Sequence, residues 1–552
     1  MRWRAILPAM LVVGGVAIVT AIAVSRPIHD LNAPSAEQAS GDLEEAASRI
    51  DTAIETRLTA EHLVQSEPAE ELAVLRRLSL ALIGTIPSLE EIRRFEADRR
   101  ADRLTLWTNA YLNDPRFADY FAERLARAFV GVEGGQFVVY RRDRFTSWLA
   151  DQIRQRTPYD EMVRSMLSET GVATDRAAVN FAMAAFANSH FDPNKLAGRT
   201  VRAFLGQRID CAQCHNHPFS HWKQKQFEGL AACFGELDLT LVGAVDRPQK
   251  PSPEDESAMM ALPLDAYPAV PFSPEWFPAE GSPRTRLAEW VTHPDNQRFE
   301  RAIANRVWGL MFGKPYLTDR PVDDLPDPDD PSIDSQTDVL AILGADFRAH
   351  GSSLHRMIQV ITATRAFRRS STAPDSSYES SSASSSTLTL EDSERLWGIF
   401  PLVRLRPEQM IGSMLQSNSV QTIDQNSHLF TRTFRLFRER DYINEFGDPG
   451  EAELEQRTAT ITQTLLNMNG EFASEMSRVR LFSTPQVLRQ YSPTTETLLD
   501  NLFLTCFTRR PTSTEREYFR QQLPESTREI EDELIEDIFW TLYNSPEFCW
   551  NH

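Results

Sequence analysis

Residues 71–95 read ELAVLRRLSLALIGTIPSLEEIRRF, a stretch that contains two helix signals in succession. Its first half places apolar side chains mostly three or four positions apart, which is the spacing of one helix face: Leu72, Leu75, Leu78, Leu82 and Ile83. Gly84 can end this helix, and Ser88 and Glu91 have the capping-box spacing that begins another. The stretch therefore predicts a helical hairpin whose first helix belongs to a core.

The same helical periodicity extends along most of the chain. It predicts helices at roughly 101–112, 115–130, 143–156 and 159–168, and amphipathic helices again between residues 287 and 367. No segment shows a convincing alternation of apolar and polar residues, the pattern that strands produce. We therefore expect a mostly α fold with a multi-helical body.

The two ends of the chain share one sequence pattern. At a constant offset, six residues align with six similar residues: Leu78, Leu80, Pro87, Ser88, Glu91 and Phe95 with Leu502, Leu504, Pro511, Thr512, Glu515 and Phe519. NDPRF at 113–117 also resembles NSPEF at 544–548. The repetition predicts related helical hairpin units near both ends. Capped hairpins that resemble one another without common ancestry are the alternative.

The N-terminus carries the signature of a membrane-anchor helix. Arg2 and Arg4 precede residues 5–24, in which Thr20 is the one clearly polar side chain. At about 1.5 Å per residue, a helix of this length crosses a hydrocarbon core of about 30 Å. The basic flank favours a single-pass protein of the cell membrane whose large domain is exported, periplasmic or extracytoplasmic. A signal peptide cleaved near AIA at 21–23 is the alternative, and it also exports the protein.

Composition and the proline-rich, acidic and serine-rich segments predict how the rest of the chain is divided. Hydrophobic residues make up 41% of the chain, as in folded proteins, and the net charge of −20 argues against nucleic acid as a partner, because surfaces that bind it are normally basic. We expect these segments: a signal anchor or signal peptide at 1–30, a helical spacer at 31–66, a helical domain at 67–243, a proline-rich acidic linker at 244–283, and a second helical domain at 284–552 with a serine-rich insertion at 370–390.

Residues 211–221 read CAQCHNHPFSH and include a Cys-x-x-Cys-His signature. This signature is how c-type haem is attached to proteins. Cys211 and Cys214 can each form a thioether to one vinyl group of a porphyrin, and His215 lies close enough in sequence to become the proximal iron ligand. We therefore expect haem c at these three residues and a redox or electron-transfer role.

Two other interpretations of the same run remain open. Cys211, Cys214, His217 and His221 form a ligand set that zinc accepts in tetrahedral geometry, although Cys214 and His217 are closer in sequence than in the usual zinc finger. A short-loop disulfide between the two cysteines is also chemically permitted in an exported protein. Either arrangement would make the protein a non-enzymatic scaffold or interaction protein with a structural cysteine and histidine cluster.

A haem at this run would need a second axial ligand from the opposite face of the porphyrin. His217 is too close in sequence to His215 to reach that face easily. The candidates with sulfur or imidazole donors elsewhere are Met183, His190, Met259 and Met260.

Residues 319–334 form an acidic loop whose oxygens suit calcium, with aspartates at Asp323, Asp324, Asp327, Asp329 and Asp330. Their spacing matches no EF-hand loop, and the prolines of the segment keep it extended. We therefore interpret the segment as a solvated loop.

The first half of the chain resembles the domain of unknown function 1549, a cytochrome-associated family of secreted planctomycete-type proteins. The segments that carry the resemblance are 78–95, NDPRF at 113–117, FLGQ at 204–207 and, above all, CAQCHNHPF at 211–219. The second half resembles the family's usual companion, domain of unknown function 1553, at these segments: RLAEW (286–290), NRVW (305–308), PVDD (321–324), LRPE (405–408) and NSPEF (544–548).

The resemblance covers most of the chain after residue 65, and the cysteine block is its most specific part. It implies an exported protein linked to cytochrome-like electron-transfer partners. It implies no particular activity, because the family has none that is settled.

Overall fold

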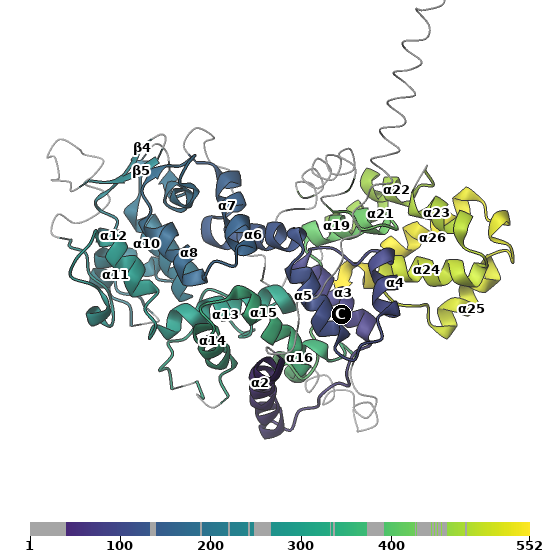
Figure 1. The fold of residues 1–552 in the computed structure, drawn as a ribbon, viewed down its shortest axis with the longest axis horizontal. Helices are drawn as coiled ribbons and strands as arrows, with labels where there is room; N and C mark the ends of the chain where they lie inside the picture. Colours follow the sequence, from purple (N-terminus) through teal and green to yellow (C-terminus); the bar gives the residue numbers. More distant parts are fainter. Residues whose placement is uncertain are drawn as a thin grey trace, which may run out of the picture.

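A computed structural model gives the fold of the chain. It describes residues 40–132, 140–187, 190–218, 221–240, 243–247, 266–331, 333–334, 337–372, 391–424, 461–480 and 483–552, with a few single positions between 425 and 460. The described residues are mostly helical (Figure 1), which confirms the predicted fold class at this level.

The helices before residue 240 are α2 (Ser40–Ala60), α3 (Glu71–Leu82), α4 (Leu89–Ala97), α5 (Arg103–Leu112), α6 (Pro115–Val130), α7 (Arg142–Arg154), α8 (Tyr159–Ser168), α9 (Asn180–Met183), α10 (Pro193–Leu205) and α11 (Gln224–Ala232). Two short 3₁₀ turns lie among them, η1 (Ala177–Val179) and η2 (Asp210–Gln213). The four helices predicted between residues 101 and 168 therefore correspond to α5, α6, α7 and α8.

The later helices are α12 (Pro283–Val291), α13 (Gln297–Phe312), α14 (Val339–Ala349), α15 (Leu354–Ala363), α16 (Arg365–Arg368), α19 (Pro407–Ser417), α21 (Ile461–Asn469), α22 (Glu471–Ser477), α23 (Thr484–Tyr491), α24 (Thr495–Phe507), α25 (Ser513–Gln522) and α26 (Asp532–Tyr543). The described residues of this half also contain the 3₁₀ turns η4 (Pro274–Trp276), η6 (Thr527–Glu529) and η7 (Pro546–Cys549).

Strands are short in the part of the chain that the structure describes. β1 (Gly171–Val172), β5 (Gly243–Asp246) and β4 (Leu237–Thr240) form one antiparallel sheet in that order. β2 (Phe186–Ala187) pairs with β3 (His190–Phe191), and β6 (Val403–Arg404) pairs with β7 (Trp550–Asn551). The last pair brings the end of the chain back to the segment before α19.

Both predicted capping boxes are present. The Ser88 hydroxyl accepts from the Glu91 backbone N–H at 3.0 Å, and a Glu91 carboxylate oxygen accepts from the Ser88 N–H at 2.8 Å, which fixes the start of α4. Thr512 and Glu515 form the same reciprocal cap at the start of α25. Gly84 follows α3 with a φ of 78°, the left-handed conformation that glycine adopts at little cost.

The segment predicted as a spacer contains α2, and one face of this helix is buried. Ile50, Ile54 and Leu58 are at most 1% exposed and belong to the same core as α14 and α15. Burial of three such side chains supplies several kcal/mol of hydrophobic stabilisation, at about 1.5–3 kcal/mol each. α2 is therefore a part of the folded body.

Two hydrophobic cores organise the described residues, and α3 contributes to both. The first core contains residues from Leu43 to Phe400, together with Leu454 and Leu504, and includes residues on both sides of the segment 244–283. The second joins residues from α19 to η7 with Leu80 of α3 and with Ile86. Figure 1 shows α3, α4 and α5, in purple, beside the yellow C-terminal helices.

Two buried arginines of α3 strengthen this contact with the end of the chain. The Arg76 guanidinium donates to the Cys506 carbonyl at 3.1 Å, and Arg77 donates to the His552 carbonyl at 2.8 Å and to the Arg369 carbonyl at 2.6 Å. Burial lowers the pKa of Arg76 to about 10 and that of Arg77 to about 9. The carbonyl acceptors offset part of the cost of burying the two charges.

The predicted anchor helix at residues 5–24 lies outside the described residues. Among the helices that are described, none combines the length and the hydropathy of a membrane span. The serine-rich segment 373–390 also lies outside the described residues.

Candidate functional site

The Cys-x-x-Cys-His run occupies the connection between α10 and α11. α10 ends at Gly206, whose φ of 63° turns the chain toward η2, which contains Cys211. A Cβ at Gly206 would lie 3.0 Å from Leu325 Cδ1 and 3.1 Å from Ala302 Cβ, and the Gly206 carbonyl accepts from the Leu325 N–H at 2.7 Å. The start of the cysteine connection is thus packed closely against the second half of the chain.

The cysteine loop, which we define as residues 207–224, presents its chemically reactive groups to solvent. Three reactive side chains are exposed: Cys211, Cys214 and His215. Two apolar side chains of the same turn, Ile209 and Ala212, are fully buried and attach the turn to the core. The two thiols and the imidazole are therefore accessible on one short, anchored turn.

His215 has a defined tautomer in this arrangement. Its Nδ1 lies 2.7 Å from the Asn216 carbonyl oxygen, which can only accept, so Nδ1 donates. The neutral ring then carries its lone pair on Nε2, the nitrogen that can bind a metal. The donor set of two free thiols and one imidazole with a ligating nitrogen fits the attachment of a c-type haem.

Backbone hydrogen bonds close the second part of the cysteine loop. The His217 N–H donates to the Trp222 carbonyl at 2.8 Å, and the Gln224 N–H donates to the Asn216 side-chain oxygen at 3.1 Å. Trp222 is 3% exposed and anchors this end of the loop. Residues 219 and 220 lie outside the described residues.

All five cysteines lie in the described part of the chain, and none forms a disulfide. Cys233 and Cys506 are buried, which raises the pKa of the Cys233 thiol to about 12 and that of Cys506 above its ordinary value. Cys211 and Cys214 differ from these two because they are exposed. Cys549 is half-buried, so the two exposed thiols of the chain are those of the signature.

The predicted zinc ligands are not assembled into a metal site. Within the described ranges, no three side chains of His, Cys, Asp or Glu converge on a position that could hold a metal ion. His221 instead places its Nδ1 3.2 Å from Asp327 Oδ2 and stacks on Trp222. Zinc at Cys211, Cys214, His217 and His221 would require this histidine to leave Asp327.

Asp327 ties the cysteine loop to the second half. Its Oδ1 accepts from the Gln207 side-chain amide at 2.7 Å and pairs with Arg298 of α13 at 2.8 Å, while its Oδ2 faces His221. One carboxylate thus contacts both ends of the loop.

Asp323 makes a second tie. It is 8% exposed and pairs with Arg208 at 2.8 Å and with Arg202 of α10 at 3.6 Å. The interpretation of residues 319–334 as a solvated loop is therefore wrong for Asp323 and Asp327, because arginine and histidine side chains from other elements take the place of water. Of the residues in these contacts, Gln207 belongs to FLGQ at 204–207 and Asp323 to PVDD at 321–324, although neither sequence segment shows that it meets the other.

Of the four candidate distal ligands, Met183 is the one whose side chain the structure describes. Met183 is fully buried in the first core, whereas the thiols lie at the surface. The side chain of His190 and residues 259 and 260 lie outside what the structure describes. The second axial ligand stays a prediction.

Comparison with known proteins identifies two family regions in the chain. Residues 49–238 match the family model PSCyt2, a protein of unknown function (DUF1549), and residues 283–523 match the family model PSD1, a protein of unknown function (DUF1553). No curated protein and no solved structure matches the chain. The cysteine loop lies in the first match and its two aspartate ties lie in the second. The chain belongs to the proteins in which a DUF1549 region is followed by a DUF1553 region.

Proposed function

We propose that this protein is an exported, membrane-anchored redox or electron-transfer component that holds one c-type haem on Cys211, Cys214 and His215. The observation that carries the proposal is the exposure of two unbonded thiols on one turn, followed directly by an imidazole whose Nε2 can ligate. When bound there, a haem supplies reversible one-electron chemistry.

The roles of the chain's own residues follow from their positions. Cys211 and Cys214 would each hold the haem through a thioether to one vinyl group, with the thiol hydrogen passing to the other vinyl carbon. His215 orients its Nε2 by donating Nδ1–H to the Asn216 carbonyl. Ile209 and Ala212 hold the turn in place from the core side.

Export and partners complete the proposal. The apolar segment 5–24 anchors the chain in the membrane, and its basic flank places the large domain outside the cytoplasm. The partners are cytochrome-like electron-transfer proteins, and the shared capping boxes of α4 and α25 support related hairpin units at the two ends.

The test is covalent haem in the full chain produced in cells that mature c-type cytochromes. Haem staining of the denatured protein should be positive for the natural chain and for C233A/C549A, which removes two cysteines outside the loop. It should be negative for C211A/C214A, with the thermal unfolding of that variant retained. Equal staining of both double variants, or none of the natural chain, would contradict the proposal.

A second candidate is a non-enzymatic scaffold whose cysteine and histidine cluster is structural, with zinc or a disulfide. The observation that favours it is the set of contacts by which Asp323 and Asp327 join the cysteine loop to the second half. In that case C211A/C214A would unfold at a lower temperature, the natural chain would be colourless, and metal analysis would separate zinc from a disulfide.

A further inference from the structure

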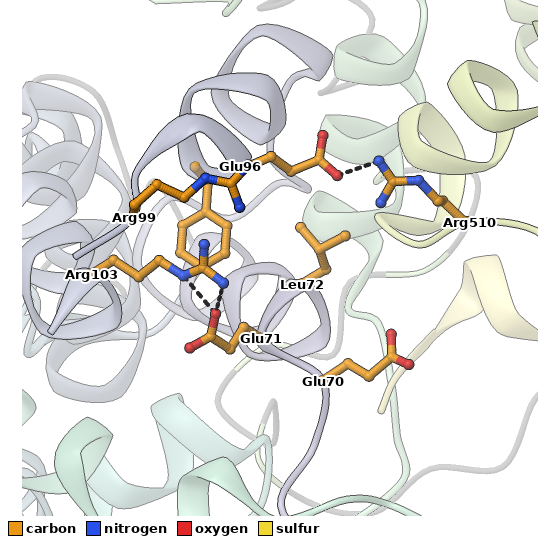
Figure 2. A pocket seen from close by; sticks show the side chains of 8 residues that line it. Glu70, Glu71, Leu72, Glu96, Arg99, Arg103 and Arg510 are labelled. Carbon is orange, nitrogen blue, oxygen red and sulfur yellow. Dashed lines mark hydrogen bonds and ion pairs between the residues drawn. The ribbon is translucent and has the colours of Figure 1, made fainter. Parts of the chain in front are cut away.

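A cleft lies where the first half of the chain meets the turn between α24 and α25. Its residues are distant in sequence from the cysteine loop. Its volume is about 570 Å³, which is within the range of small-molecule sites. Figure 2 shows its lining: Glu70, Glu71, Leu72, Phe95, Glu96, Arg99, Arg103 and Arg510. Arg510 comes from the DUF1553 match and the other residues come from the DUF1549 match.

Most of the charges in this cleft are already neutralised. Arg103 donates to the Glu71 carboxylate at 2.5 Å and lies over the Phe95 ring, 4.7 Å from its centroid. Arg510 pairs with Glu96 at 2.6 Å. These two ion pairs leave one guanidinium and one carboxylate among the lining charges.

The remaining charges are Arg99 and Glu70. Neither side chain has a hydrogen bond or an ion pair with any residue that the structure describes, and both are exposed at the cleft. In the view of Figure 2 the two side chains lie apart from one another, with Leu72 between them. The lining thus offers an unpaired positive group, an apolar side chain and an unpaired negative group.

We infer that the cleft binds a zwitterionic ligand, a free amino acid or short peptide, with its carboxylate on Arg99 and its ammonium on Glu70. A guanidinium binds a carboxylate with two parallel hydrogen bonds, which favours this group over a simple point charge. Leu72 receives an aliphatic side chain of the ligand. A ligand with negative charge alone is disfavoured, because the unpaired Glu70 carboxylate repels it.

The experiment is calorimetric titration of the purified exported chain with trialanine, a zwitterionic peptide. Two blocked peptides act as ligand controls: N-acetyl-trialanine lacks the ammonium group, and trialanine amide lacks the carboxylate. The protein variants are Arg99→Gln and Glu70→Gln, with Arg528→Gln as the control because Arg528 is exposed and does not line the cleft.

Trialanine should bind saturably, and each blocked peptide should bind about tenfold or more weakly because it loses one charged contact. Arg99→Gln should weaken trialanine by a similar factor and should abolish the difference between trialanine and its amide. Glu70→Gln should abolish the difference between trialanine and N-acetyl-trialanine, whereas Arg528→Gln should leave affinity unchanged. The inference is overturned if trialanine does not bind at millimolar concentration, if the blocked peptides bind as well, or if Arg99→Gln and Arg528→Gln behave alike. Circular dichroism confirms that each variant is folded.

Discussion

Arg124 of α6 and Glu408 of α19 form a buried ion pair between the two family regions, with side chains that are 2% and 5% exposed. Burial raises the pKa of Glu408, but the positive charges of Arg124 and Arg406 outweigh this effect, so its pKa lies below the ordinary value. Two charges that are buried together stabilise a fold only as long as both are present.

Glu408→Gln should therefore destabilise the protein by about 3–5 kcal/mol, because it removes the negative charge that Glu408 places beside the buried Arg124 and Arg406. Glu517→Gln is the matched control: Glu517 pairs with Arg520 at 3.6 Å, and both side chains are more than half exposed. The control should change stability by no more than about 0.5 kcal/mol. Urea unfolding followed by tryptophan fluorescence measures both, and similar effects would contradict the assignment.

The same carboxylate gives a pH dependence with a definite sign. Because the folded pKa of Glu408 lies below its unfolded value of about 4.3, its contribution is complete above that value and is lost as pH falls through the folded pKa. The natural chain should lose stability more steeply on acidification below about pH 4 than Glu408→Gln. If the stability of the two proteins fell equally with pH, the ion pair of Arg124 and Glu408 would not be what stabilises the contact between the two family regions.

Gly206 is expected to resist substitution more than a glycine of the same backbone conformation in open space. Gly206 has a φ of 63° and close neighbours in Leu325 and Ala302, whereas Gly351 has a φ of 65° and nothing within 4 Å of an added Cβ. Gly351→Ala should cost about 1 kcal/mol from the backbone alone, and Gly206→Ala should cost about 1–3 kcal/mol more from crowding. Equal thermal shifts would mean that the contact with the second half is looser than described.

Asp327 should contribute more to stability than the exposed Asp329 of the same acidic segment. Asp327→Asn removes the charge that faces Arg298 and His221, so stability should fall by about 1–3 kcal/mol and limited proteolysis should cut the cysteine loop faster. Asp329→Asn is the control, because Asp329 is exposed and pairs with no described residue. If Asp329→Asn had an effect of the same size, the contacts of Asp327 would not be what stabilises this segment.

The exposure of the thiols predicts which cysteines react. In protein produced without haem maturation, a maleimide should label Cys211 and Cys214 quickly under native conditions, because these two are exposed. Cys233 and Cys506 should react only after unfolding, since burial both hides them and raises the pKa of each thiol. Peptide mapping identifies the labelled sites. Absence of fast labelling at both signature cysteines would support a disulfide in their place.

Local features of the fold could be predicted from the sequence because they depend on neighbours a few positions apart. The helix at 71–82 and the caps at Ser88 and Thr512 are of this kind. Arg76 and Arg77 are different: helical periodicity assigns charged residues to solvent, but the C-terminal residues cover both side chains.

The candidate site shows the same limit. The spacing of Cys211, Cys214 and His215 predicts the proposed haem attachment, since a local motif defines it. Spacing could not show that Asp327, more than a hundred positions later, contacts the loop at Gln207 and His221, because such pairing depends on tertiary packing. Interacting charges this far apart in sequence are indistinguishable from solvated ones until the fold brings them together.

The central claim is that haem is covalently attached at Cys211 and Cys214, and a pyridine haemochrome spectrum of the full chain from cells that mature c-type cytochromes tests it most directly. The account predicts a c-type haemochrome that stays with the protein after acid extraction, at one haem per chain. A folded, colourless protein from the same cells would contradict it, and metal analysis of that sample would then distinguish a zinc site from a purely structural loop.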